Sequence, residues 1–342
     1  MKQISWQLPL LPSSRIAALG QRRSSPKLPN DPITQFLDQT MNAVLIIDKP
    51  AGLTSHGVVN RVRRILQERS VGHLGTLDPL ATGVLPLVIG NLTRLARFYT
   101  SCEKTYEGTI RFGFATDTYD AEGEPDGPPQ AVTLSFDQVC QLATRFRGLI
   151  QQTPPLFSAK KIQGVPAYKL ARKHAEVSLK PVQVEIKEFE ITRVENDRAS
   201  FRARVASGTY MRSVAHDMGQ IMGCGAHLES LRRTAVGEFE LADAHTLEEL
   251  DSAFKRGETD DLFIHPRKLL PQFPCVTAND EMATRIRTGR PVNLPELSQA
   301  RMVKVFAGQR ELIAIATRVA GTLFHAKIVL AGDPQLRQPQ AM

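Results

Sequence analysis

Residues 104–116, KTYEGTIRFGFAT, carry the clearest alternation of apolar and polar side chains in the chain. One side of this alternation holds Tyr106, Ile110, Phe112 and Phe114, and the other holds Thr105, Glu107, Thr109 and Arg111. Because successive side chains of a strand point to opposite faces, this period of two predicts a strand with one buried face. A lone strand is not stable, so the chain has to build a sheet around this segment.

Short strands and helices are expected to alternate along the rest of the chain. Its 342 residues and 42% apolar content are enough for an ordinary core. We expect a buried strand over 43–47, a helix capped by Thr54 or Ser55, an acidic loop over 117–130, a helix over 132–148, strands over 181–193 and 200–206, a helix from Met211, a short helix stopped by Gly289, and alternating strands over 301–330.

Residues 1–40 are rich in Ser, Pro, Arg and Gln and show no regular apolar period, so we expect a disordered extension. This segment is either a genuine basic or transit-like arm, or the result of a start assigned upstream of Met41. We favour the second explanation because the arm lacks an amphipathic period.

The charge balance is basic, with 43 Lys and Arg against 35 Asp and Glu and a net charge of +8. An acidic partner such as nucleic acid fits this balance. However, five of the basic and two of the acidic groups lie in the first 40 residues, which leaves only +5 for the remainder. The net charge by itself is therefore weak evidence for a nucleic-acid partner.

Several classes of protein are excluded by missing motifs. The sequence contains neither G-x-x-x-x-G-K nor G-x-G-x-x-G, which argues against ATP and dinucleotide chemistry. The cysteines Cys102, Cys140, Cys224 and Cys275 form no Cys-x-x-Cys pair and are expected to be reduced. Without a long apolar run or a secretory signal, the sequence predicts a cytoplasmic location.

The stretch GHLGTLDPLATGVLP, residues 72–86, surrounds a single carboxylate with glycines and prolines. Pro79 biases Asp78 toward extended geometry, and Gly75 and Gly83 allow tight turns on either side. Such a loop would fix the direction of the Asp78 side chain. The alternative is an ordinary turn, since Asp-Pro commonly starts one.

Four ordered motifs carry a resemblance to a known family. GHLGTLDPLATGVLP, KTYEGTIRFGFATDTYDAEG, TPPLFSAKKIQGVPAYKLAR and SGTYMRSVAHDMG…CGAHLESLRRTAVGEF together resemble the TruB family of tRNA pseudouridine synthases, of the bacterial type, over residues 44–239. The resemblance implies a mixed α/β fold around one large, mainly antiparallel sheet, with a small β-rich C-terminal domain similar to PUA domains. The implied domains are a catalytic domain over 41–262 with a thumb-like insertion around 120–165, a C-terminal domain over 270–332, and a flexible tail over 333–342.

The resemblance also implies a reaction, the conversion of uridine 55 in the T-loop of tRNA to pseudouridine. No redox change or phosphate transfer occurs in this reaction, so no cofactor or metal is expected. Asp78 is implied as the catalytic group, either a nucleophile or a base at the sugar, and Arg212 as the cation that pairs with it. An opposite charge nearby is expected to keep the aspartate ionised despite burial.

The remaining implied contacts fall into two sets. His73, Tyr106, Tyr210 and Leu231 match positions near the extruded uridine, although each is also compatible with an ordinary structural role. Basic residues interleaved with Phe157 and Tyr168 suit an RNA backbone, although a solvated helix face is the alternative. These candidates are Lys160, Lys161, Lys169, Arg172 and Lys173, joined by Arg232 and Arg233.

Three hypotheses are compatible with the sequence. The first is a stand-alone, monomeric tRNA uridine isomerase that binds the T-arm and needs no protein partner. The second is a noncatalytic RNA-binding or RNA-folding protein. The third is a guide-RNA-dependent synthase of the archaeal and eukaryotic type. The presence of Asp78, Tyr106 and Arg212 favours the first hypothesis over the second. The C-terminal block, which resembles the bacterial type, and the length of the 120–165 insertion favour the first over the third.

Overall fold

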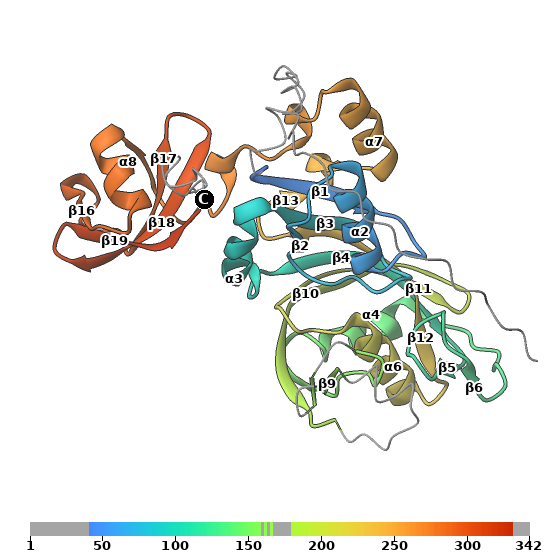
Figure 1. The fold of residues 1–342 in the computed structure, drawn as a ribbon. Coiled ribbons are helices and arrows are strands. Elements are labelled where there is room, and N and C mark those ends of the chain that lie inside the picture. The colour runs from blue at the N-terminus through green and yellow to red at the C-terminus, as the bar shows by residue number, and fades with distance from the viewer. Residues whose placement is uncertain (1–40, 159–160, 163–164, 167–178, 331–342) are drawn as a thin grey trace, which may run out of the picture. The chain divides into compact units, whose positions relative to one another are not determined.

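The computed structural model describes residues 41–158, 161–162, 165–166 and 179–330. The extension predicted over 1–40 and the tail predicted over 333–342 lie outside the described residues. Figure 1 shows the arrangement of the helices and strands. Within the described ranges, no helix combines the length and the apolar character needed to cross a membrane.

A mixed sheet of ten strands dominates the described residues (Figure 1). Its strands follow the order β14-β1-β3-β12-β4-β11-β10-β7, and β2 and β13 pair with β3 and β12. The strands are β1 (Ala43–Lys49), β2 (Val71–His73), β3 (Thr82–Ile89), β4 (Lys104–Phe112), β7 (Gly148–Gln152), β10 (Val182–Glu195), β11 (Arg198–Val205), β12 (Ala226–Val236), β13 (Phe239–Glu240) and β14 (Ala244–His245). Within this sheet β1 pairs with β14 and β12 with β3 in parallel, and the other pairs are antiparallel. The expected large, mainly antiparallel sheet is therefore confirmed.

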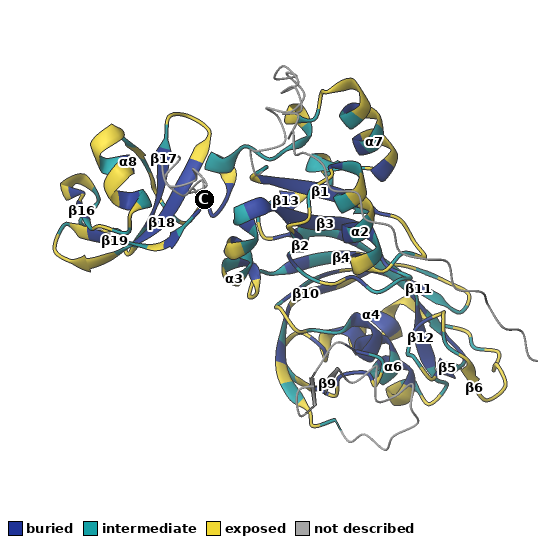
Figure 2. Ribbon diagram, viewed as in Figure 1, coloured by how far each residue is buried: buried dark blue, intermediate teal, exposed yellow. Residues whose placement is uncertain are grey.

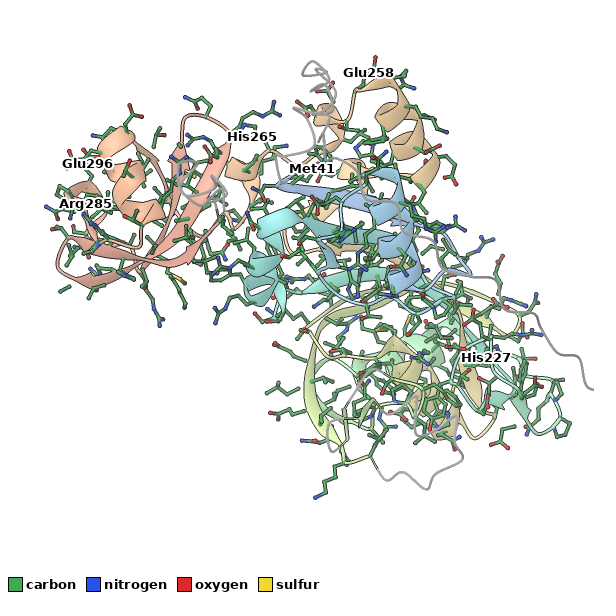
Figure 3. The ribbon with its side chains drawn as sticks, viewed as in Figure 1. Met41, His227, Glu258, His265, Arg285 and Glu296 are labelled. Carbon is green, nitrogen blue, oxygen red and sulfur yellow. The ribbon has the colours of Figure 1, made fainter. Side chains whose placement is uncertain are left out.

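Strand β4 is shorter than the alternation of residues 104–116 predicts. It ends at Phe112, where Gly113 takes a φ of +105° and a side chain at this position would come within 2.6 Å of the Gln130 carbonyl oxygen. The chain bends there and forms β5 (Ala115–Thr116), which pairs with β6 (Pro125–Asp126). Phe114 consequently leaves the face of Tyr106 and packs on the ring of His227, which Figure 3 labels, with 4.5 Å between ring centroids.

Helices cover one face of the large sheet and explain its apolar pattern. They are α2 (Ser55–Ile65), α4 (Phe136–Thr144), α6 (Met211–Met222) and α7 (Leu247–Arg256). On β1, Leu45 and Ile47 pack into the core beneath these helices, whereas Val44 and Ile46 pack with a second core that includes η2 (Gly90–Leu95) and α3 (Ala96–Tyr99). Because both faces are covered, β1 is a continuous apolar run, and Figure 2 shows it as buried.

The helix ends show how local sequence sets these elements. Thr54, rather than Ser55, caps α2, since its hydroxyl accepts a hydrogen bond from the Gly57 amide at 2.9 Å. Helix α4 begins after Ser135 and ends at Thr144, so the prediction of a helix over 132–148 is too long at both ends. Gly148, expected to end that helix, instead begins strand β7 with a φ of +83°.

A second sheet of five strands lies in the C-terminal part of the described chain. The order is β15-β17-β18-β19-β16, with β15 (Cys275–Ala278), β16 (Val292–Asn293), β17 (Met302–Ala307), β18 (Glu311–Ala320) and β19 (Leu323–Val329). Helix α8 (Asp280–Arg287) buries Ala283 and Ile286, while Arg285 points outward in Figure 3. The expected small β-rich part is therefore confirmed, and the exact domain boundaries stay a prediction.

The remaining short elements connect these parts. They are β8 (Lys161–Ile162), β9 (Val165–Pro166), η3 (Leu241–Asp243), η4 (Asp260–Leu262), η5 (Pro266–Lys268) and η6 (Pro295–Leu297). Strands β8 and β9 form a separate two-stranded pair.

Gly83 lies where β3 pairs with β12, opposite Arg233. A Cβ atom at this glycine, whose φ is +97°, would lie 2.2 Å from the Arg233 carbonyl oxygen. We therefore expect Gly83→Ala to lower the free energy of unfolding by about 3 kcal/mol, through backbone strain and forced separation of the strands.

The matched control is Gly257→Ala, because Gly257 has a φ of +73° but open space around its Cβ position. It should cost only about 1 kcal/mol of backbone strain. Urea titration of both variants measures the free energy of unfolding. Equal losses in the two variants would show that the close contact between β3 and β12 adds nothing to the backbone strain.

Candidate active site

Asp78 lies on the loop that joins β2 to β3, and the backbone of this loop is held by buried side chains from three other elements. The first is Ser55 at the start of α2, which is 2% exposed. Its hydroxyl donates to the Leu77 carbonyl at 3.0 Å and accepts from the Leu77 amide at 2.7 Å. Both polar groups of the residue before Asp78 are therefore fixed by one side chain.

The second is Lys49 at the end of β1, which is fully buried. Its ammonium group donates to the carbonyl oxygens of Pro50 and Pro79, at 2.9 and 3.1 Å. The Gly52 amide donates to the same Pro79 oxygen at 2.9 Å. Burial lowers the pKa of Lys49 to about 8, while the charges of Glu122 and Asp78 oppose the shift. The backbone that follows Asp78 is thus fixed as firmly as the backbone that precedes it.

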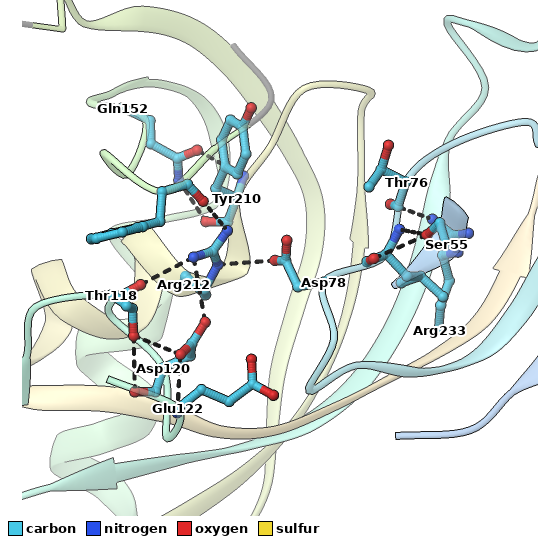
Figure 4. A network of polar contacts seen from close by, with 12 residues as sticks. Ser55, Thr76, Asp78, Thr118, Asp120, Glu122, Gln152, Tyr210, Arg212 and Arg233 are labelled. Atoms are coloured by element: carbon cyan, nitrogen blue, oxygen red, sulfur yellow. Dashed lines mark hydrogen bonds and ion pairs between the residues drawn. The ribbon is translucent and has the colours of Figure 1, made fainter. Parts of the chain in front are cut away.

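The third is Arg233 on β12, which the sequence analysis proposed as a phosphate contact. This interpretation is wrong, because Arg233 is 1% exposed and its guanidinium donates to the backbone carbonyls of Gly75, Thr76 and Val84. Figure 4 shows Arg233, Ser55 and Thr76 together, on the side of Asp78 away from Arg212. Asp78 is thus presented by a loop with a fixed backbone.

Arg212, the second residue of α6, lies opposite Asp78 and forms the centre of a polar network (Figure 4). Its Nε lies 2.9 Å from Oδ2 of Asp78, and its Nη1 lies 3.3 Å from Oδ2 of Asp120. Nη1 and Nη2 also donate to the carbonyl oxygens of Thr118 and Phe157, at 3.1 and 3.0 Å. The ion pair expected between Arg212 and Asp78 is therefore present.

The two members of this pair differ in their access to solvent. The Arg212 side chain is 5% exposed, whereas the Asp78 side chain is 39% exposed. A ligand in the cleft can therefore reach the carboxylate, while the arginine acts from behind it.

Asp120 is one of the residues of the site that the sequence analysis missed. Its Oδ1 accepts from the Thr118 hydroxyl at 2.6 Å and from the Glu122 amide at 3.1 Å, and its side chain is 4% exposed. The segment 117–130 was predicted only as a turn-rich acidic loop. The available signal was Thr118, placed two residues earlier, since Ser and Thr hydroxyls commonly bond within such turns.

The cleft walls shield the Asp78 carboxylate from much of the bulk water although a ligand can reach it. This desolvation raises the pKa of Asp78, Arg212 opposes the rise, and the charge of Asp120 adds to it. Burial thus has a larger effect on the Asp78 pKa than the attraction to Arg212. Whether Arg212 keeps Asp78 ionised, as the sequence analysis expects, stays a prediction.

Asp78 opens into a cleft of about 960 Å³, at the upper end of the range for ligand pockets. The candidates His73, Tyr106, Tyr210 and Leu231 all line this cleft. Burial raises the pKa of the Tyr210 phenol, and burial together with Arg233 lowers the pKa of His73. The cleft therefore joins aromatic and apolar walls to the accessible carboxylates of Asp78 and Glu122.

Tyr210 is held in the cleft through its backbone. The side-chain amide of Gln152, the last residue of β7, donates to the Tyr210 carbonyl at 3.1 Å and accepts from the Tyr210 amide at 2.8 Å. Gln152 is 1% exposed, and the sequence analysis did not identify it.

The candidates for RNA backbone contacts are only partly described by the structure. Lys160, Lys169, Arg172 and Lys173 lie outside the described residues, and for Lys161 only the backbone, on β8, is described. Arg232 is half-buried, and its guanidinium pairs with both carboxylate oxygens of Asp48, at 3.1 and 2.7 Å. An RNA phosphate would have to compete with Asp48 for this group.

In the part of the chain that the structure describes, no three or more His, Cys, Asp or Glu residues are arranged to hold a metal ion.

The geometry predicts the direction of one pH effect. A reaction that needs the ionised Asp78 loses rate as the pH falls through the raised pKa of this group. Because the negative charge of Asp120 contributes to this rise, Asp120→Asn should move the acidic limb of the single-turnover rate to lower pH. The plateau should also fall, since Arg212 loses a charged partner.

The control is Asp251→Asn on α7, whose carboxylate pairs with Lys255. This variant should keep the pH profile of the unmodified protein. An acidic limb that stays in place in Asp120→Asn would show that Asp120 does not influence the titration of Asp78.

Two solved complexes contain chains with a similar fold. The chain is similar to a chain of a Cbf5–Nop10–Gar1 complex, with 24% identity, a TM-score of 0.64 and 85% of each chain covered. It is also similar to a chain of an H/ACA RNP bound to a substrate RNA containing 2′-deoxyuridine, with 23% identity, a TM-score of 0.62, and 84% of this chain and 85% of the other covered. At this level of identity the similarity establishes the fold.

Comparisons of the sequence define the class of protein. Residues 63–211 match the N-terminal domain of TruB family pseudouridylate synthases, and residues 212–270 match the C-terminal domain of tRNA pseudouridylate synthase B. A tRNA pseudouridine synthase B from Solibacter usitatus is 49% identical over 294 residues, which cover 85% of this chain and 100% of the relative. One from Dehalococcoides mccartyi is 37% identical over 296 residues, which cover 86% and 99%.

The fold and the site, with these matches, define an isomerase of the pseudouridine synthase class. The likeness of two bacterial relatives over nearly their full length places the chain more narrowly. It belongs to the TruB family of pseudouridylate synthases.

Proposed function

We propose that this enzyme converts uridine 55 in the T-loop of tRNA to pseudouridine, with Asp78 as the catalytic group and without a cofactor. The observation that carries the proposal is the ion pair of Asp78 and Arg212 in the wall of a cleft of about 960 Å³. The relatives named tRNA pseudouridine synthase B support tRNA as the substrate.

The chemistry needs an anionic group close to the sugar. The N1–C1′ bond of uridine breaks, the uracil turns, and a C5–C1′ bond forms, while C5 loses a proton and N1 gains one. A carboxylate can serve as a nucleophile or as a base at the sugar, and both roles require its ionised form. Asp78 is accessible from the cleft, and Arg212 stabilises its charge from the buried side.

The uridine has to leave its stack before Asp78 can reach it. Extrusion costs a few kcal/mol and costs least where the nucleotide already lies in a loop. Tyr106, which is 8% exposed, and Tyr210 both line the cleft, and stacking on an aromatic ring contributes about 1–3 kcal/mol per base. This favours a structured hairpin such as the T-arm as the substrate.

Backbone contacts are proposed for the basic segment that contains Lys160, Lys161, Lys169 and Arg172. Positive side chains at this segment would hold the RNA by its phosphates, independently of base identity. The proposed domains are the catalytic domain over 41–262 and the C-terminal domain over 270–332. We propose that the enzyme acts as a monomer, without an obligatory protein partner.

The test is to incubate the purified protein with an unmodified tRNA transcript, without nucleotide, metal or guide RNA, and to map pseudouridine. We expect one product position, at the T-loop uridine. A transcript with cytidine at that position is the control and should yield no pseudouridine. Binding without any product would favour a noncatalytic RNA-folding protein.

The similarity to chains of H/ACA assemblies makes guide-dependent activity the second candidate. The same incubation separates the two, since a guide-dependent synthase would stay inactive on tRNA alone. The higher identity to the relatives named tRNA pseudouridine synthase B favours tRNA itself as the substrate.

A further inference from the structure

Arg233 is a buried cation that the proposed chemistry does not use. With 1% of its surface exposed, it is one of the largest fully buried side chains among the described residues. Its Nε donates to Val84 at 2.8 Å, its Nη1 to Thr76 at 3.2 Å and its Nη2 to Gly75 at 3.1 Å, each time to a backbone carbonyl oxygen. Burying a charged group is costly unless its hydrogen bonds are satisfied, and here three backbone carbonyl oxygens satisfy them. The role of these three hydrogen bonds is therefore of interest.

The three acceptors lie at the two ends of the loop that carries Asp78. Gly75 and Thr76 precede Asp78, and Val84 follows it on β3. A guanidinium is planar and presents its N–H groups in a rigid fork, so one side chain fixes the peptide groups at both ends. Arg233 therefore closes this loop at its base.

A glycine lies at each end of the loop, next to Arg233. Gly75 takes a φ of +132°, and the Cβ position of this glycine lies 3.6 Å from Nη1 of Arg233. Gly83, at the other end, faces the Arg233 backbone in the parallel register of β3 and β12. Gly75 thus lies beside the Arg233 guanidinium, and Gly83 lies opposite the Arg233 backbone.

Ser55 and Lys49 fix the residues next to Asp78, and Arg233 fixes the residues outside them. In Figure 4, Arg233 lies beyond the loop, and the carboxylate of Asp78 points the other way, toward Arg212. The position of the carboxylate then depends on a backbone whose ends are held by one buried side chain.

We propose that Arg233 is a positioning residue for pseudouridine formation, which fixes the loop so that the Asp78 carboxylate meets the sugar of the extruded uridine. This inference rests on the proposed catalytic role of Asp78. Its effect is expected on the chemical step, because a displacement of about 1 Å at a reacting group costs about 100-fold in rate.

The experiment compares Arg233→Ala and Arg233→Lys with the unmodified enzyme in steady-state and single-turnover assays on a tRNA transcript. For Arg233→Ala we expect a kcat about 100-fold lower and a KM within about threefold of the original. Arg233→Lys keeps the charge but loses the fork, so we expect it to fold and to lose at least about tenfold in kcat.

Chemical rescue distinguishes positioning from a general loss of structure. Guanidinium ion, added to Arg233→Ala at a low, non-denaturing concentration, should occupy the vacated space beside the three carbonyls and raise kcat about tenfold. Sodium chloride at the same ionic strength should not raise kcat. Urea, which has the same shape as guanidinium but no charge, should not raise it either. The control variant is Arg198→Ala on β11, an exposed arginine that pairs with Asp197 and Glu229 and should not respond.

The outcomes separate this inference from the proposed function. An active Asp78→Asn in the same assay would overturn the role of Asp78, and this inference with it. An inactive Asp78→Asn beside a folded Arg233→Ala with nearly full kcat would overturn only the role of Arg233. A raised KM at unchanged kcat would show that Arg233 contacts RNA. Failure of both Arg233 variants to fold would show that Arg233 stabilises the whole fold. Either result would also overturn the assignment of Arg233 as a positioning residue.

Discussion

Asp78→Asn is expected to form no measurable pseudouridine, with a single-turnover rate at least about 10⁴-fold below that of the unmodified enzyme. The amide has nearly the same shape as the carboxylate, so the loop held by Ser55, Lys49 and Arg233 should keep its conformation. The amide cannot ionise and therefore cannot act as a nucleophile or as a base. The loss should appear in the chemical step.

Affinity for tRNA should stay within about tenfold in the same variant, because phosphate contacts supply most of the binding free energy. Filter binding at a fixed salt concentration measures this, and Asp251→Asn, on the exposed side of α7, serves as the matched control. If affinity collapsed together with activity, Asp78 would have a structural role instead.

Arg212→Met is expected to have the second largest effect. The substitution leaves Asp78 and Asp120 near one another without the cation that lies between them. We expect kcat to fall about 10³-fold, because Asp78 then binds a proton more readily and loses its fixed partner. The free energy of unfolding should fall by about 2 kcal/mol, below the usual cost of breaking a buried pair, since Asp78 is 39% exposed and partly screened by solvent.

Arg198→Met provides the matched control for this variant. Arg198 also pairs with two carboxylates, those of Asp197 and Glu229, but its side chain is 42% exposed. Exposed ion pairs contribute about 0–1 kcal/mol, so this change should cost little stability and no activity. Equal effects of the two substitutions would show that the network around Asp78 has no special role.

Local sequence patterns predict much of the fold, whereas the central pair of the site is predicted only by the family resemblance. The helix that begins near Met211 follows from its apolar spacing, and the resemblance to the TruB family places Arg212 next to Asp78. The loop around Asp78 is recognisable from its sequence. Pro79 restricts the backbone of Asp78, and Gly75 and Gly83 allow positive φ on either side.

Residues buried by tertiary contacts were harder to predict. In the stretch LESLRRTAV, neither composition nor spacing shows which of Arg232 and Arg233 points inward, and the structure buries the second while the first pairs with Asp48. Asp120 is buried because its loop pairs with β12 through Leu228 and its carboxylate meets Arg212. These contacts join segments about 100 residues apart, which no local pattern records.

The most direct test of the account is a crystal structure of Asp78→Asn bound to an unmodified T-arm stem-loop. We expect the target uridine to be extruded into the cleft beside Tyr106, with the side chain at position 78 about 3–3.5 Å from C1′, a distance suited to reaction. A uridine bound elsewhere, with this side chain facing bulk solvent, would contradict the account.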